Sequence, residues 1–417
     1  MIPGIELSHD NWRATTLGAV RVEGKASIDP RKTPDELFEL YSVPSYDDRF
    51  PEIVTGSQIG SSKQIVEEGE LLLCKINPRI NRVWIVGNRS SYKKIASTEW
   101  IKFGKRQDLN QKFLAYYLST AKFRDFLAQN VSGVGGSLMR IKASVFADYP
   151  FMMPPMDEQE RIVAKIEQLF SELDAGAEGL KKAQAQLKHY RQSVLKHAFE
   201  GRLTNDNIKD GELPERWTSL ALGTIADVSG GLTKNSKRGE LPVERPFLRV
   251  ANVYFDRLDL GEMHTIRLRE TEVEKVELKE GDLLFVEGNG SVSQIGRVAV
   301  WKGDIPGCVH QNHLIKARFE GGLLPRFALY FFCSPVGRDR IRIQASSTSG
   351  LHTLSTGKVR GLELPVCPPD EQQRIVAALE SRLSVCDKMQ EAIETGLKQA
   401  EALQQSILKR AFEGKLV

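Results

Sequence analysis

Two stretches of the chain carry apolar residues at the spacing of long helices. In the first stretch the apolar residues recur every seven positions, at Ile166, Leu173, Leu180, Leu187 and Val194. A seven-residue repeat predicts a helix with a coiled-coil seam. The second stretch has a looser apolar stripe, made of Leu379, Leu383, Cys386, Ile393, Leu397, Ala400 and Ile407. The pattern therefore predicts long helices within residues 154–204 and 367–417, each needing a partner to cover its stripe.

The two helical stretches are copies of one another. Residues 157–164, Asp-Glu-Gln-Glu-Arg-Ile-Val-Ala, recur at 370–377 as Asp-Glu-Gln-Gln-Arg-Ile-Val-Ala. Residues 195–203 recur at 408–416 with the same separation. The chain is thus an internal duplication. The economical partner for each helix is the other copy, running in the opposite direction.

The start of each helix has its own sequence signal. Paired prolines at 154–155 and 368–369 close the preceding domain. Asp157 with Glu160, and Asp370 with Gln373, have the spacing of a capping box. We therefore expect these aspartates to cap the two helices.

The remaining sequence predicts a mixed α/β fold. Residues 71–76, 83–86, 282–286 and 297–301 have the composition of strands, and residues 113–127 and 326–341 have helical periodicity. We predict an α+β protein with a pseudo-two-fold internal repeat. Two mixed α/β domains, at 1–153 and 205–366, are separated by two long antiparallel coiled-coil helices, at 154–204 and 367–417. A chain of 417 residues also exceeds one ordinary core.

Composition narrows the class of protein. The net charge is only +4, and the excess of basic residues falls within residues 1–153, so any contact with DNA must come from local patches. The five cysteines are widely spaced and fit neither a disulfide framework nor a zinc site. The sequence has no apolar run of membrane-spanning length and no basic-then-apolar leader at its start. We expect a cytoplasmic protein without a membrane partner.

Motifs of catalysis are missing from the sequence. It contains no phosphate-binding loop, no dinucleotide fingerprint and no nucleophile elbow. The segment Asn77-Pro78-Arg79 only approaches the Asn-Pro-Pro-aromatic tetrad of amino-methyltransferases. His310 and His313 lack an acidic or cysteine companion at ligand spacing. We therefore expect neither catalytic residues nor a metal site.

Polar turns between predicted strands are the candidates for DNA contact. The first turn, residues 75–82, offers Lys75, Asn77, Arg79 and Arg82. The corresponding turn of the second copy offers Asn289, Ser291, Gln294 and Arg297. Arginine and asparagine pair bidentately with guanine and adenine edges. Surface turns are polar in any protein, so each residue taken alone also has an ordinary structural explanation.

The repeated motifs resemble those of type I restriction-modification specificity subunits. In that family a Pro-Pro-x-x-Glu-Gln signature opens each long helix. Residues 154–159 meet it fully, and residues 368–372 meet it with one residue fewer. The closing sequence Ala-Phe-Glu-Gly-Arg/Lys-Leu, at 198–203 and 411–416, also resembles the family. The resemblance extends over effectively the whole chain.

The resemblance implies how the chain works. Each variable domain would read one half of a bipartite, asymmetric site in double-stranded DNA, and the helices would set the spacing. They would also dock two methyltransferase subunits, which motor-nuclease subunits join. S-adenosylmethionine, ATP and magnesium would belong to those partners, and this chain would bind no cofactor and catalyse nothing.

The resemblance also extends the set of candidate residues. It adds to the DNA-binding candidates Ser97, Thr98, Gln311, Asn312 and His313, and Arg140 is a further candidate. The candidates for partner binding lie at the helix ends and are Glu158, Gln159, Arg161, Phe199, Glu371, Gln372, Arg374 and Phe412.

Two other functions remain open at this stage. The chain could be an enzyme, either a subunit of a fused restriction-methylation system with a separate but obligatory catalytic chain or a nuclease without a recognisable motif. Methyl transfer or cleavage by this chain alone would favour that. It could instead be a scaffold whose helices organise other proteins. Absence of sequence-specific DNA binding, even with partners present, would favour the scaffold.

Overall fold

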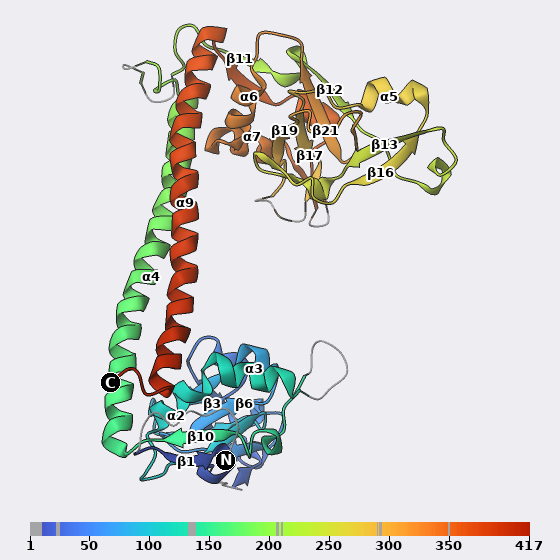
Figure 1. Cartoon of the computed structure of the whole chain (residues 1–417). Helices are drawn as coiled ribbons and strands as arrows, with labels where there is room; N and C mark the ends of the chain where they lie inside the picture. Colours follow the sequence, from blue (N-terminus) through green and yellow to red (C-terminus); the bar gives the residue numbers. More distant parts are fainter. Residues whose placement is uncertain are drawn as a thin grey trace. The chain divides into compact units, whose positions relative to one another are not determined.

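The computed structural model describes residues 11–21, 26–131, 139–205, 208–209, 212–289, 291, 294–348 and 351–417 (Figure 1). The chain forms two compact units. Unit 1 comprises Met1–Leu180 and Glu394–Val417, and unit 2 comprises Lys181–Ile393. Each long helix is therefore divided between the units. The predicted four segments follow one another along the chain, whereas each compact unit combines one variable region with parts of both helices.

Unit 1 contains two main sheets. The strands of its five-stranded sheet, in spatial order, are β2 (Ser27–Ile28), β5 (Lys63–Ile65), β8 (Lys93–Ala96), β3 (Leu37–Tyr41) and β4 (Glu52–Thr55). The three-stranded sheet has the order β7 (Val83–Ile85), β6 (Leu71–Cys74) and β9 (Trp100–Phe103). A separate pair joins β1 (Arg13–Thr16) to β10 (Pro150–Met153). The short helices are α1 (Leu17–Val20), α2 (Gln111–Leu118) and α3 (Ala121–Gln129).

Unit 2 repeats this plan with additional strands. Its four-stranded sheet has the order β12 (Ala226–Gly230), β21 (Leu314–Phe319), β17 (Leu283–Val286) and β19 (Val298–Val300). Two three-stranded sheets follow, β16 (His264–Leu268), β13 (Val243–Leu248), β20 (Val309–His310) and β18 (Gly288–Asn289), β23 (Leu351–Thr353), β22 (Ser346–Thr348). Two further pairs are β11 (Thr218–Ala221) with β24 (Glu363–Val366) and β14 (Val253–Tyr254) with β15 (Arg257–Leu258). The short helices are α5 (Glu270–Val276), α6 (Pro325–Cys333), α7 (Pro335–Gln344) and α8 (Thr356–Arg360).

The central strand of each unit is buried on both faces. In β6, Leu71 and Leu73 enter one apolar cluster, while Leu72 and Cys74 enter another that contains Trp84 and Trp100. Strand β17 divides in the same way between two clusters. Side chains alternate across a strand, so burial on both faces requires a continuous apolar run. This explains the runs from which both strands were predicted.

The two long helices are α4 (Met156–Phe199) and α9 (Pro369–Phe412), each of 44 residues. Figure 1 shows both as unbroken, α4 in green and α9 in red. In unit 1, Asp174 accepts a hydrogen bond from Gln404 at 3.1 Å, and Gly396 lies against Leu180. In unit 2, Arg191 pairs with Asp387 at 2.6 Å. Within each unit the helix segments therefore pair antiparallel, as the sequence predicted.

Two local predictions are wrong. The capping box is not formed: the helices begin before the aspartates, and the amides of Gln159 and Gln372 donate to the carbonyls of Pro155 and Pro368. The single helices predicted at 113–127 and 326–341 are each two helices, α2 with α3 and α6 with α7. The breaks occur where Thr120 and Ser334 cap a new helix, accepting bonds from the amides of Phe123 and Gly337.

No helix within the described residues is both long enough and apolar enough to cross a membrane. The five cysteines are all unpaired, and four of them are buried. They therefore contribute to packing, as their spacing suggested.

Candidate nucleic-acid interface

Three segments of unit 1 meet where β6 ends. The amide of Lys75 donates to the carbonyl of Glu99 at 2.8 Å, and the carbonyl of Lys75 accepts from the amide of Ile141 at 3.0 Å. We call this meeting point the first junction. Its side chains are linked as well, because the ammonium of Lys75 donates to the Thr98 carbonyl at 2.6 Å and Arg140 pairs with Glu99 at 2.9 Å. The structure thus brings together Lys75, Thr98 and Arg140, and the Ser97 hydroxyl joins them by accepting from the Glu99 amide at 3.2 Å.

The turn beyond the first junction is held in a fixed conformation. Asn77 and Asn81 both have positive φ, 47° and 50°, and flank a 3₁₀ turn formed by Pro78–Ile80. Asparagine tolerates this left-handed conformation better than most residues. The Asn77 amide donates to the Met139 carbonyl at 2.9 Å, and the Asn81 side chain donates to the Leu118 carbonyl at 2.7 Å. Anchored at both ends, the turn presents Arg79 to solvent.

Arg82 does not share this exposure. Its side chain is only 13% exposed, and its Nε lies 3.5 Å from Asp47 at the base of the turn. Arg82 is therefore less accessible than Arg79, and its contact with DNA stays a prediction.

Unit 2 repeats the junction with different side chains. The amide of Glu287 donates to the carbonyl of His313 at 2.9 Å, and its carbonyl accepts from the amide of Leu354 at 2.7 Å. This is the second junction, in which Glu287 takes the place of Lys75 and His313 that of Glu99. Nδ1 of His313 lies 2.6 Å from the Glu287 carboxylate. One backbone arrangement thus carries a lysine in one copy and a glutamate in the other.

The predicted residues of the second copy differ in their contacts and in their exposure to solvent. Asn312 lies beside His313, with 3.4 Å between the Asn312 Nδ2 and the His313 Nε2. Gln311 is half-buried, and its side-chain oxygen accepts from the Val250 amide at 3.2 Å. Ser291 and Gln294 are exposed. The backbone of Asn289 pairs with His352, but its side chain lies outside the described part of the structure.

Arg297 is held close to the second junction. Its Nη2 donates to the Val250 carbonyl at 3.4 Å, and its guanidinium lies 5.5 Å from the ring centre of Tyr254. Val250 thereby links Arg297 to Gln311.

His310 and His313, the two histidines close together in the sequence, have different environments. His310 is fully buried, with its Nδ1 2.9 Å from the Val276 carbonyl. Burial lowers the pKa of His310 to about 4, so its ring is neutral at pH 7. His313 is more than half exposed. Within the described ranges, no three histidine, cysteine or acidic side chains gather in a way that could hold a metal.

The two glutamines predicted to bind partners form buried hydrogen bonds within the chain. The side chain of Gln159 is fully buried, donates to the carbonyls of Asp108 and Pro154 at 3.0 and 2.9 Å, and accepts from the Asn110 amide at 2.8 Å. Gln372 makes the matching bonds, to the carbonyls of Gly322 and Cys367 and from the Leu324 amide, at 2.8–2.9 Å. Each glutamine side chain therefore fastens a helix start to its neighbouring domain.

The glutamates of the same motif are also used internally. Glu158 accepts from the Trp12 indole at 2.9 Å. Glu371 is 6% exposed and accepts from Thr204 at 2.6 Å and Asn205 at 3.0 Å. Burial opposes its charge, yet these hydrogen bonds keep the pKa of Glu371 below its usual value.

The phenylalanines at the helix ends pack against the apolar cores, Phe199 as a buried and Phe412 as a half-buried side chain. Phe199 is 4% exposed and packs edge-on against Phe327 and Phe331 at 5.1 and 5.3 Å. Phe412 packs on Phe113 and Tyr117, both at 5.1 Å. Of the eight candidates for partner binding, Arg161 and Arg374 are exposed and the other six are buried or half-buried. Partner binding at these positions stays a prediction.

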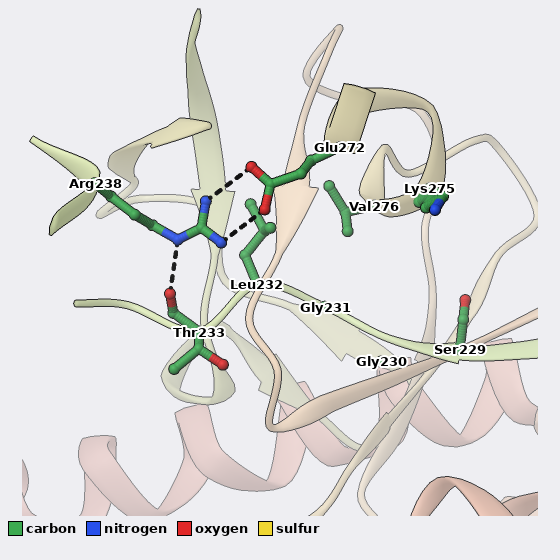
Figure 2. A pocket seen from close by; sticks show the side chains of 9 residues that line it. All are labelled: Ser229, Gly230, Gly231, Leu232, Thr233, Arg238, Glu272, Lys275 and Val276. Atoms are coloured by element: carbon green, nitrogen blue, oxygen red, sulfur yellow. Dashed lines mark hydrogen bonds and ion pairs between the residues drawn. The ribbon is translucent and has the colours of Figure 1, made fainter. Parts of the chain in front are cut away.

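One exposed segment was missed by the sequence analysis. After β12, residues Thr233, Lys234, Asn235, Ser236 and Lys237 form a loop that is exposed throughout. The loop borders a cavity of about 380 Å³, and Figure 2 shows Arg238 closing the loop by bonds to Glu272 and Thr233. The sequence signal for this loop is Gly230-Gly231 followed by a short polar and basic run, which no predicted strand precedes.

Comparison with known proteins identifies the kind of domain. Residues 23–182 match the family model described as the type I restriction modification DNA specificity domain. The chain is 28% identical over 310 residues to the EcoKI type I restriction enzyme specificity subunit of Escherichia coli (strain K12). That match covers 73% of this chain and 65% of the relative. The StySPI specificity subunit of Salmonella potsdam is also 28% identical, over 74% of this chain and 66% of its own length.

Solved structures share the fold. A chain from a type I R-M system superposes with a TM-score of 0.80 at 20% identity, covering 98% of this chain and 99% of that one. The HsdS subunit from Thermoanaerobacter tengcongensis gives a TM-score of 0.56 at 20% identity, over 98% of both chains. The matches to the two curated subunits span just under two thirds of those proteins. In sequence over residues 23–182, and in fold over nearly its whole length, the chain is therefore similar to type I restriction-modification specificity subunits.

Proposed function

We propose that this chain selects the DNA sequence on which a type I restriction-modification complex acts. Residues 1–153 and 205–366 would each read one half of a bipartite, asymmetric site in double-stranded DNA. The observation that carries this proposal is the repeated junction: the same backbone bonds at Lys75 and Glu287 present different side chains. Equal frameworks with unequal polar groups suit two modules that read different half-sites.

The long helices have a separate part in this proposal. They would set the spacing of the half-sites and dock two methyltransferase subunits, which motor-nuclease subunits would then join. Val385 and Met389, four residues apart and therefore on one face of α9, are 57% and 52% exposed. Exposed apolar residues on a helix favour a protein partner. Arg161 and Arg374 are the remaining candidates near the helix starts.

The chemistry would reside in the partners. In this proposal S-adenosylmethionine, ATP and magnesium bind to the methyltransferase and motor subunits, and this chain contributes recognition without catalysis. The complex would act on DNA in the cytoplasm.

Selection from random DNA tests the proposal. The chain would be assembled with its cognate methyltransferase subunits and used to select duplexes from a randomised library. We expect two short conserved blocks with a fixed, unspecified spacer. A single block, or no enrichment at all, would contradict two-domain recognition.

Arg79→Ala tests the first junction. Because Arg79 is exposed at the tip of an anchored turn, its loss should weaken preference for the first half-site by about 1–3 kcal/mol, roughly 5- to 150-fold in affinity, and spare the second. The measurement is binding to duplexes altered in either half-site. Arg89→Ala is the matched control, since Arg89 is exposed after the other end of β7. Equal weakening on every duplex would make Arg79 a phosphate contact.

A further inference from the structure

The segment Gln311–His313 lies between two neighbouring chain segments of unit 2. On one side the Gln311 amide donates to the Leu248 carbonyl at 3.0 Å, continuing the parallel pairing of β20 with β13. On the other side the Leu232 amide donates to the His310 carbonyl at 2.8 Å, and the Asn312 amide donates to the Leu232 carbonyl at 3.0 Å. The candidate recognition residues of the second domain are thus flanked on both sides.

The first flank is the basic loop that follows Leu232. Lys234 and Lys237 are exposed and form no ion pair with any residue in the described ranges. Five residues span at most about 18 Å when extended, so both lysines lie within about 18 Å of Leu232, whose carbonyl accepts from the Asn312 amide. Gly231, just before this loop, lets the chain pass close to His310, because a Cβ at Gly231 would lie 2.1 Å from the His310 carbonyl oxygen.

Arg238 holds this loop in shape. Its Nε donates to the Thr233 carbonyl at 2.8 Å, and its two terminal nitrogens donate to the Glu272 carboxylate at 3.2 and 3.0 Å (Figure 2). The Arg238 side chain is 15% exposed. Its hydrogen bonds hold the pKa of Glu272 below its usual value, so the clamp stays charged at neutral pH. The loop therefore presents two lysines from a closed, preorganised base.

The second flank is the segment after Leu248, which contains Tyr254 and Arg257, together with Arg297, which contacts Tyr254 from just before the start of β19. The guanidinium of Arg257 lies 4.6 Å from the ring centre of Tyr254, and that of Arg297 lies 5.5 Å from it. Tyr254 and Arg257 are exposed. A ring contact occupies the face of a guanidinium and leaves N–H groups on its edge for an anion.

We infer that these two basic flanks bind DNA phosphates on either side of the bases approached by Gln311–His313. The inference rests on the proposed function of this domain. A groove of duplex DNA has a phosphate backbone along each edge, so an element entering it meets phosphates on both sides. Lysine is a flexible point charge that suits phosphate better than a base edge. The flanks would fix the position of the domain, and the second junction would supply sequence preference.

The salt dependence of binding tests the inference. The complex of this chain with its cognate methyltransferase subunits would carry the double change Lys234→Ala and Lys237→Ala. Each lost phosphate contact lowers the slope of log affinity against log salt by about 0.9, so we expect a reduction of about 2. Affinity should fall by the same factor on cognate DNA and on DNA altered in the second half-site. Arg257→Ala should lower the slope by about 1.

A matched pair of lysines provides the control. Lys279 and Lys302 are exposed and lie near the start of β17, whose other end leads into the second junction. Alanine at both positions removes the same charge and should leave the slope unchanged. Equal slopes for the two double variants would overturn the inference. A changed base preference in the Lys234/Lys237 variant would also overturn it, since the lysines would then read bases. Failure of the unaltered complex to prefer any bipartite site would instead refute the proposed function itself.

Discussion

Gln372→Ala is expected to destabilise unit 2 strongly. The side chain is fully buried and satisfies two carbonyls and one amide, of Gly322, Cys367 and Leu324. Each buried group left without a partner costs about 1–3 kcal/mol, so the free energy of unfolding should fall by about 3 kcal/mol or more. Urea unfolding measures the loss, and faster hydrogen exchange at the Leu324 amide would locate it in unit 2. Exchange is needed because a chain of two units need not unfold in one step.

The neighbouring glutamine is the control for this prediction. Gln373 is exposed, so its replacement by alanine should change stability by less than about 0.5 kcal/mol. Gln159→Ala should reproduce the effect in unit 1 and leave exchange in unit 2 unaltered. If the changes at 372 and 373 had equal effects, the buried hydrogen bonds would not be fastening the helix to the domain.

Lengthening both helices should change which DNA site is used. Seven residues inserted after Leu180 and seven after Ile393 preserve the heptad seam and add about 10 Å at 1.5 Å per residue. Under the proposed function the two half-sites should then be recognised with a spacer about 3 base pairs longer, at 3.4 Å per pair. The original site should be lost. Selection from the randomised library gives the preferred spacer directly.

An insertion in one helix alone is the control. It shifts one side of the antiparallel pairing, including Asp174 with Gln404 and Arg191 with Asp387, and should reduce stability without defining a new spacer. An unchanged spacer after insertion in both helices would contradict the proposed role of the helices.

The helices and central strands could be predicted because their signals are local. A heptad repeat and an apolar run report burial directly, and the duplication assigned each helix a partner. The breaks at Thr120 and Ser334 were missed because helical periodicity continues across them, while capping depends on one hydroxyl. The residues gathered at the junctions were named from the sequence, but their convergence depends on backbone bonds between segments more than 20 residues apart, such as Lys75 with Glu99.

The role of the Glu-Gln motif could not be inferred from its sequence. A polar pair at a helix start is exposed in most proteins, and the groups that bury Gln159 lie about 50 residues away, at Asp108 and Asn110. Arg82 illustrates the same difficulty, because strands β4, β5 and β6 separate it in the sequence from Asp47, which lies beside its side chain. A motif that occurs twice indicates that its residues make a required contact. It does not show whether that contact lies within the chain or with a partner.

The pattern of adenine methylation in native genomic DNA tests most directly whether this chain selects the DNA site. Cells that express the cognate methyltransferase subunit would be compared with and without this gene. We expect a bipartite methylated sequence that is present only with the gene and has two different half-sites. No difference between the two methylation patterns, with the methyltransferase subunit shown to be expressed, would contradict the claim that this chain selects the site.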